Sequence, residues 1–191
     1  MAYRLKSEKL TGKTLRKVSI EQTGRALQVL AKETVSPEDV HEARKAVKRV
    51  RSLLKLLEPE LAAATFRARY KGIGEAGGHL SGARDRHVLD ETLDKLVLRF
   101  GKDFKPVATA VRGILDAWRP ATQPSKLSQD ELEKAKRVFA REARSLAKID
   151  VSGRGFGLIA AGLEETYRTA KKNFASAYRR PSDDRFHEMR K

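Results

Sequence analysis

The 191-residue chain contains no cysteine and few aromatic residues, and each shortage excludes a class of function. Without cysteine there are no disulfides, Cys-based zinc sites, iron–sulfur clusters or thiol nucleophiles, and a reducing compartment is expected. An aromatic content of 6% argues against a surface built mainly for stacking on bases. No apolar run approaches the ~20 residues of a membrane span, and the first residues lack a signal peptide's apolar core. We therefore expect a soluble, cytoplasmic protein that does not bind membranes.

Acidic residues are also in short supply. The 25 Asp and Glu residues stand against 41 Lys and Arg residues, which gives a formal net charge of +16 and a pI of about 10.2. Such a surplus favours a polyanionic partner. The length suits one domain of good size or two small ones.

Helix-forming residues dominate, and apolar residues recur three or four positions apart, which predicts an all-α fold of antiparallel helical bundles. Ser36 and Ser128 each open a helix as the N-cap of a capping box, and Pro59 ends the helix that follows Ser36. A glycine-rich stretch, 72–78, is expected to follow the third helix. The predicted helices span about residues 13–32, 37–58, 60–71, 83–100, 102–118, 129–149 and 156–179, with a last helix of two turns at most from about 183.

A connector at 119–125 contains two prolines and is the predicted seam between two units. The expected organisation is a first helical bundle over 1–120 and the start of a second bundle over 128–191. The second bundle is expected to be incomplete at its C-terminus.

Two segments of the first half recur in the second half in the same order. Residues 20–27 resemble 163–170, and residues 41–45 resemble 187–191. Together the matches predict two copies of one helical hairpin, the second of them truncated. The chain therefore looks like a fragment of a longer repeat protein, with possible self-association through its C-terminal half.

One predicted helix carries a basic stripe. At 100° per residue its members fall within about 80° of the helix circumference, along about 21 Å of helix, and apolar residues such as Val50 and Leu54 occupy the opposite side. Glu42 and Glu58 lie only at the ends of the stripe, so its middle needs an acidic partner from elsewhere. The stripe consists of His41, Arg44, Lys48, Arg51 and Lys55.

The same spacing recurs in a later helix, and a third basic segment follows. Two such helices lying side by side would form a basic trough. A basic helix face is also commonly just solvated, and that interpretation stays open for each helix alone. The second set is Lys134, Arg137, Arg141, Arg144 and Lys148, and the third is Arg168, Lys171, Lys172 and Arg179.

Enzymatic function is disfavoured. The string 72–77 matches a dinucleotide-binding Gly-x-Gly-x-x-Gly pattern, but it follows a predicted helix instead of a strand. The glycines are better interpreted as sites of close helix packing or a bend. We expect a non-catalytic module without a cofactor.

A metal site is also disfavoured. His87 with Asp90 or Glu91 could ligate a metal, but helix-surface histidines near acids are common. A site formed by His41 and His187 would lie among cations, which repel a metal ion. An imidazole can instead donate a hydrogen bond to a phosphate oxygen.

These motifs resemble the CHAD, or conserved histidine α-helical domain, family. The resemblance rests on residues 40–51, 84–89 and 167–191, and it extends from about residue 20 to the end. It implies two pseudo-symmetric helical bundles whose basic inner faces bind inorganic polyphosphate, in proteins associated with polyphosphate granules. The anion contacts that it implies by position are His41, Arg44, Lys48, Arg51, Arg84, Arg168, Lys171, His187, Arg190 and Lys191.

The predicted function is therefore non-catalytic binding of polyphosphate, or of related phosphate or sulfate anions, in a basic groove. The basic helix faces add five residues to the predicted contacts: Lys55, Lys134, Arg137, Arg141 and Lys172. Nucleic-acid binding is the nearest alternative because the phosphate backbone offers the same charge pattern. A scaffold that docks on an acidic protein partner is the other.

Overall fold

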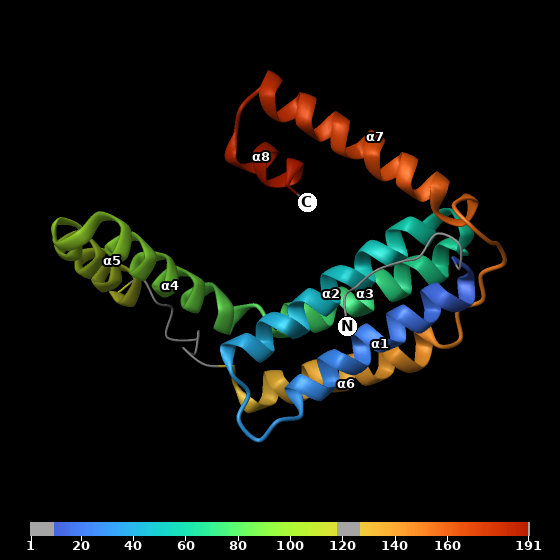
Figure 1. The fold of residues 1–191 in the computed structure, drawn as a ribbon, viewed down its shortest axis with the longest axis horizontal. Helices are drawn as coiled ribbons and strands as arrows, with labels where there is room; N and C mark the ends of the chain where they lie inside the picture. Colours follow the sequence, from blue (N-terminus) through green and yellow to red (C-terminus); the bar gives the residue numbers. More distant parts are fainter. Residues whose placement is uncertain (1–9, 118–126, 191) are drawn as a thin grey trace.

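The computed structural model describes residues 10–117 and 127–190, and for 82–88 the backbone alone. These residues form helices and no strand (Figure 1), which confirms the all-α prediction. None of the described helices is both long and apolar enough to cross a membrane. The elements are α1 (Gly12–Leu30), α2 (Pro37–Leu57), the 3-10 turn η2 (Glu58–Glu60), α3 (Ala63–His79), α4 (Gly82–Phe100), η3 (Gly101–Phe104), α5 (Lys105–Ala117), α6 (Gln129–Leu146), α7 (Gly157–Arg179) and α8 (Asp183–Met189).

Helices α1, α2, α3 and α6 form a four-helix bundle (Figure 1). Both α2 and α6 pack against α1 and α3, so α2 and α6 occupy diagonal corners. One core cluster joins all four helices, with Leu30, Val50, Ile73 and Phe139 fully buried in it.

Helix α6, which follows the predicted seam, packs with the helices that precede the seam. Its apolar face, which includes Leu132, Val138 and Phe139, is buried in the same core as α1, α2 and α3. The physical reason is that an apolar helix face is stabilised by any complementary groove, and the groove between α1 and α3 is available to it. The predicted connector, 119–125, lies outside the described residues.

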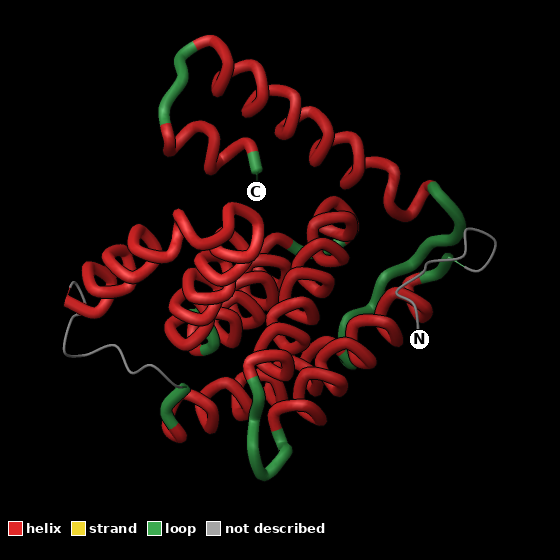
Figure 2. The backbone as a smooth tube through the Cα atoms, turned by 60° about the vertical axis from the view of Figure 1, so that its left-hand side comes forward, coloured by secondary structure: helices red, strands yellow, loops and turns green. Residues whose placement is uncertain are grey.

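Two helical arms project from the bundle (Figures 1 and 2). Helix α7 packs against the end of α2, where a Cβ added to Gly162 would lie 2.2 Å from the carbonyl oxygen of Leu56. A second apolar cluster, which includes Leu53, Leu57 and Leu158, fixes this junction. Helix α8 then folds back on α7, while α4 and α5 form the other arm. The short α8 confirms the predicted final helix of two turns at most.

The glycine-rich stretch does not end a helix, contrary to prediction, because α3 runs through it to His79. At Gly72 an added Cβ would lie 2.3 Å from Oε1 of Glu142, and at Gly77 it would lie 3.2 Å from Val47. The alternative interpretation, that the glycines allow close helix packing, is therefore confirmed at these two positions.

Buried Glu142 explains why Gly72 must stay small. Its side chain is almost fully buried, and it accepts hydrogen bonds from Arg69 Nη1 (2.9 Å) and Arg141 Nε (3.1 Å). A buried carboxylate is stabilised only while such partners are kept. Glu142 therefore cannot move aside at low cost for a larger residue at position 72.

Both predicted capping boxes are present, at Ser36 and at Ser128. In the first, Ser36 accepts a hydrogen bond from the backbone N–H of Asp39, and the Asp39 carboxylate accepts one from the backbone N–H of Ser36. The carboxylate also accepts a hydrogen bond from Lys32 Nζ at 2.6 Å. The hydrogen bond from Lys32, followed by those from Ser36, lowers the pKa of Asp39 from 3.8 to about 2.

We predict opposite effects of alanine at two glycines of α3. Gly72→Ala should lower the free energy of unfolding by about 1–3 kcal/mol, because the added methyl group clashes with Glu142. The matched control Gly74→Ala should raise it by up to about 1 kcal/mol, because no atom lies within 4 Å of its Cβ and alanine favours the helix. Urea denaturation measures both, and equal effects would contradict the packing described.

We also predict that Asp39→Asn destabilises the protein in a pH-dependent way. The folded-state pKa is below the unfolded one, so the carboxylate's contribution is complete above about pH 4 and is lost as the pH falls towards 2. The difference in unfolding free energy between wild type and variant should shrink over that range. Glu38→Gln, which changes an exposed acid in the same turn, is the control and should show no such trend.

Candidate anion-binding site

The predicted basic stripe on α2 lies on the side of the helix away from the core and next to α3. We call its residues, His41, Arg44, Lys48, Arg51 and Lys55, the α2 stripe. Buried residues of α2, among them Val50 and Leu54, turn the opposite face into the bundle. The core therefore fixes the direction in which the stripe points.

Helix α3 holds three cations of the α2 stripe. Arg44 Nη1 donates a hydrogen bond to the carbonyl oxygen of Leu80 at 3.1 Å. The Arg51 guanidinium lies 4.2 Å from the centre of the Tyr70 ring, and Lys55 Nζ lies 5.1 Å from the centre of the Phe66 ring. Cation–π contacts of this kind attract the cation to the face of the ring and hold the side chain in place.

The middle of the α2 stripe carries uncompensated positive charge. No carboxylate of the described residues lies within ion-pair distance of Lys48, which is exposed, or of Arg51. Lys55, at the end of the stripe, pairs with Glu58 at 2.8 Å. Glu42 is engaged by Lys45 at 2.5 Å, and this hydrogen bond lowers the pKa of the Glu42 carboxyl.

Tyr70 and Phe66 were not predicted as part of the site. They stand four residues apart on α3 and pack ring against ring at 5.2 Å. This spacing shows in the sequence only that the two side chains share a helix face. That α2 presents cations to them depends on how the two helices pack.

The basic face of α6 does not join the α2 stripe. Helices α2 and α6 turn their buried faces to one core from diagonal corners, with α1 and α3 between them. Lys134, Arg137 and Arg141 therefore stand on a helix that is not the neighbour of α2. The expected trough between these two helices is not formed.

Carboxylates also pair with two of the five cations of the α6 face. Lys134 pairs with Asp130 at 2.5 Å, and its hydrogen bond lowers the pKa of Asp130. Arg141 pairs with Glu75 at 2.9 Å and with Glu142, and the hydrogen bonds that it donates to these two carboxylates raise the pKa of the guanidinium. This face resembles the ordinary solvated helix face that the sequence had left open.

The rest of the predicted anion contacts that the structure describes lie on the arm formed by α7 and α8. Arg168 pairs with Glu164 (2.7 Å) and Glu165 (3.2 Å). Because α7 packs against α2, this arm rises from the α2 side of the bundle (Figure 1). The other predicted contacts on the arm are exposed, namely Lys171, Lys172, His187 and Arg190, and so is Arg179 of the third basic segment.

Three residues named from the sequence lie outside the described part of the structure. Lys191 does so entirely, and Arg84 and His87 do so with their side chains. Among the residues that are described, no cluster of three or more His, Asp or Glu side chains could hold a metal ion.

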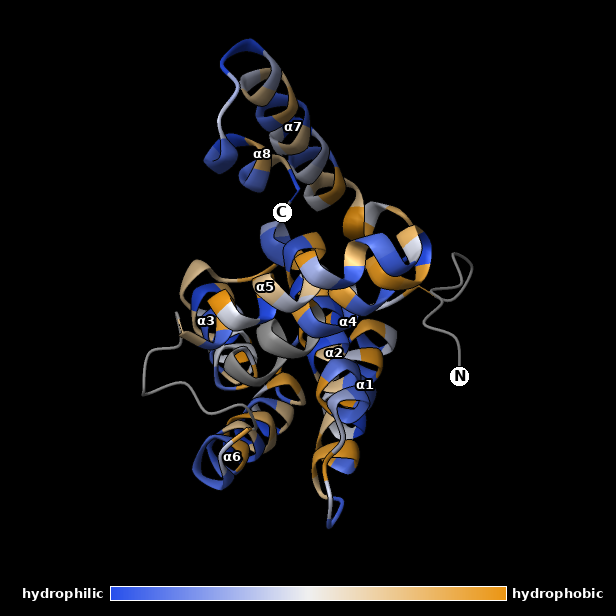
Figure 3. Ribbon diagram, turned by 90° about the vertical axis from the view of Figure 1, so that its left-hand side faces the viewer, coloured by the Kyte–Doolittle hydropathy of each residue, from blue (hydrophilic) through white to orange (hydrophobic). Residues whose placement is uncertain are grey.

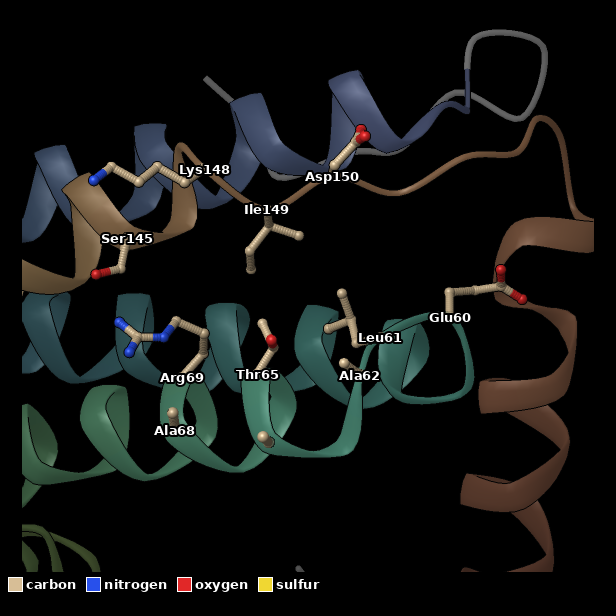
Figure 4. A pocket seen from close by; sticks show the side chains of 11 residues that line it. Glu60, Leu61, Ala62, Thr65, Ala68, Arg69, Ser145, Lys148, Ile149 and Asp150 are labelled. Atoms are coloured by element: carbon tan, nitrogen blue, oxygen red, sulfur yellow. The ribbon is translucent and has the colours of Figure 1, made fainter.

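A cleft of about 530 Å³ lies between the start of α3 and the end of α6 (Figure 4). Arg69 and Lys148 lie towards one end, Glu60 and Asp150 towards the other, and apolar side chains lie between them. Because its charges are of both signs, the cleft does not extend the basic surface of the α2 stripe.

A family model described as the CHAD domain matches residues 20–191, which is most of the chain. No curated protein and no solved structure gave a significant match. The matched region contains α2, with its basic stripe, and also α7 and α8. From residue 20 to residue 191, this chain therefore belongs to the CHAD domain family.

Proposed function

We propose that the protein binds inorganic polyphosphate non-catalytically through the α2 stripe, at polyphosphate granules of the cytoplasm. The observation that supports this most directly is the uncompensated charge of Lys48 and Arg51 in the middle of the stripe. We add to the site the exposed cations of the α7–α8 arm, which joins the bundle at the end of α2. These further contacts are Arg168, Lys171, Lys172, His187 and Arg190, with Arg84 and Lys191 added by their position in the family motif.

The shape of the α2 stripe suits a linear polyanion. From His41 to Lys55 it follows about 21 Å of helix, so that several phosphates in succession meet a cation. Polyphosphate has no bases, and its recognition needs no stacking surface. Free phosphate and sulfate ions share the chemistry but would occupy one or two of these positions only.

Arginine and lysine would contribute differently. A guanidinium forms a fork that grips phosphate oxygens, whereas a lysine ammonium acts as a mobile point charge. Tyr70 holds the Arg51 guanidinium at 4.2 Å, so less side-chain freedom is lost when the anion binds. Lys48 is exposed and can follow the polymer.

The α6 face is not part of the proposed site. Lys134, Arg137 and Arg141 stand on the helix diagonally opposite α2, and two of them are paired with carboxylates. They offer a control set of equal charge, since the removal of two cations changes the net charge equally on either helix.

We predict that Lys48→Gln with Arg51→Gln lowers polyphosphate affinity by about tenfold at moderate salt. The slope of log affinity against log salt concentration should fall by about 1–2, because two phosphate contacts are lost. Glutamine retains part of the apolar stem that packs on Tyr70. Isothermal titration with long-chain polyphosphate over a salt series measures both quantities.

The control is the double variant Lys134→Gln with Arg137→Gln, which should change affinity much less than the α2 double variant. Circular dichroism verifies that both double variants keep their helix content. Equal losses in the two would show that net charge alone drives binding and would reject the α2 stripe as the site.

We predict that polyphosphate outcompetes nucleic acid. At equal phosphate concentration and salt, long-chain polyphosphate should displace a labelled single-stranded RNA or duplex DNA from the protein. The physical reason is that the α2 stripe presents cations but no exposed aromatic platform for bases. Nucleic acid that binds tenfold more tightly than polyphosphate would overturn the assignment.

A further inference from the structure

Helix α3 carries two exposed cations outside the predicted contacts, Arg67 and Lys71. Like the other helices of the bundle, α3 interleaves hydrophilic and hydrophobic residues along its length (Figure 3). The two cations stand four residues apart, which puts them on one side of the helix. No carboxylate of the described residues lies within ion-pair distance of either. We call these two residues the α3 row.

The one acidic residue of α3, Glu75, does not neutralise the α3 row. It follows Lys71 by four residues, a spacing at which an ion pair can form on a helix. Instead it accepts a hydrogen bond from Arg141 of α6 at 2.9 Å. The side of α3 that faces α6 therefore holds this carboxylate, and the α3 row keeps its charge.

Two contacts fix the register of α3 against α2, which lies beside it (Figure 1). Arg51 lies over the ring of Tyr70 at 4.2 Å, and Lys55 lies over the ring of Phe66 at 5.1 Å. A step of four residues forward along α2 thus corresponds to a step of four residues back along α3. The two helices run antiparallel.

This register brings the α3 row alongside the α2 stripe. Lys71 directly follows Tyr70 in α3, and Arg67 directly follows Phe66. Each cation of the α3 row is therefore level with the α2 cation that lies over the neighbouring ring. Because the axes of packed helices are about 8–10 Å apart, the two lines of cations run side by side on one face of the bundle.

Together the two lines concentrate positive charge. From Lys48 to Lys55, α2 rises about 10 Å and presents three cations of the α2 stripe. The α3 row adds two more over the same length. Like charges so close repel one another. Among the described residues, only Glu58 pairs with any of the five cations, and it does so at the end of the stripe.

This concentration differs from an ordinary solvated helix face. On α6, Lys134 and Arg141 have carboxylate partners at hydrogen-bond distance. On the face shared by α2 and α3, most of the cations have none, so their repulsion stays unrelieved in the protein alone. A bound polyanion would relieve it.

A dense line of cations favours an anion whose own charges are dense. In polyphosphate a single oxygen atom joins neighbouring phosphorus atoms, whereas a sugar separates the phosphates of a nucleic acid. More phosphates of polyphosphate therefore lie over the same length of protein surface. Each added cation gains a phosphate partner of its own only when the anion is this dense.

We infer that the α3 row binds polyphosphate together with the α2 stripe and sets the preference for polyphosphate over nucleic acid. This inference rests on the proposed function of the α2 stripe. The two helices contact the anion from two sides, where Arg67 offers a guanidinium fork and Lys71 a mobile point charge. A nucleic acid brings too few phosphates to occupy both lines of cations.

The double variant Arg67→Gln with Lys71→Gln tests the α3 row in the whole chain. Its affinity for long-chain polyphosphate should fall by about tenfold, and the slope of log affinity against log salt concentration by about 1–2. Its affinity for single-stranded DNA should fall by about threefold or less, because fewer phosphates meet the α3 row. Isothermal titration with each polymer measures these quantities.

The matched control is Lys134→Gln with Arg137→Gln, which also removes one exposed lysine and one exposed arginine, from α6. It should change either affinity much less. Circular dichroism verifies that both double variants keep their helix content.

A carboxylate introduced beside the α3 row gives an independent test. Gly74 stands three residues after Lys71, and no atom lies within 4 Å of a Cβ added there. Gly74→Glu should lower polyphosphate affinity by about fivefold, because the new charge repels the anion and lies within reach of Lys71. Gly24→Glu, at an equally open glycine of α1, makes the same change in net charge and should have little effect.

Polyphosphate affinity that is unchanged in the Arg67 and Lys71 variant, or equal effects of the two glycine variants, would overturn the α3 row as part of the site. Equal losses for polyphosphate and DNA would overturn its role in the preference. Failure of the proposed function is distinguishable from both, because Lys48→Gln with Arg51→Gln would then also leave polyphosphate affinity unchanged.

Discussion

The packing of α2 between α1 and α3 is the constraint on which the rest of the structure depends. One face of α2, with Val50 and Leu54, is buried in the core, and this sets the rotation of the helix. Because the cations stand on the other side, the same burial turns them outward and towards α3. Burial of the apolar face of α2 therefore determines the direction in which its charged face points.

Helix α3 connects the core and the candidate site. Towards α6 it carries Gly72, whose small size lets the buried Glu142 approach, and Arg69, which pairs with that carboxylate. Towards α2 it carries Phe66 and Tyr70, over which Lys55 and Arg51 lie. The close packing of α3 against α6 therefore fixes the position of Phe66 and Tyr70, which contact the cations of α2.

The α2 stripe would act through Coulomb attraction and counterion release, which depend on salt. Helix α7 joins the bundle near the end of α2, where Gly162 meets Leu56. The close approach at this glycine fixes where the α7–α8 arm leaves the bundle.

Local patterns in the sequence determined most helices, the caps at Ser36 and Ser128 and the side of α2 that carries cations, because each depends on residues a few positions apart. Only the tertiary structure decided that α6 packs with α1, α2 and α3, that α3 continues through Gly72, and that the basic faces of α2 and α6 are not side by side. Apolar burial is not directional, so several helix partners suit one apolar face, and the sequence alone does not choose among them. The contact between Arg51 and Tyr70 depends on that choice.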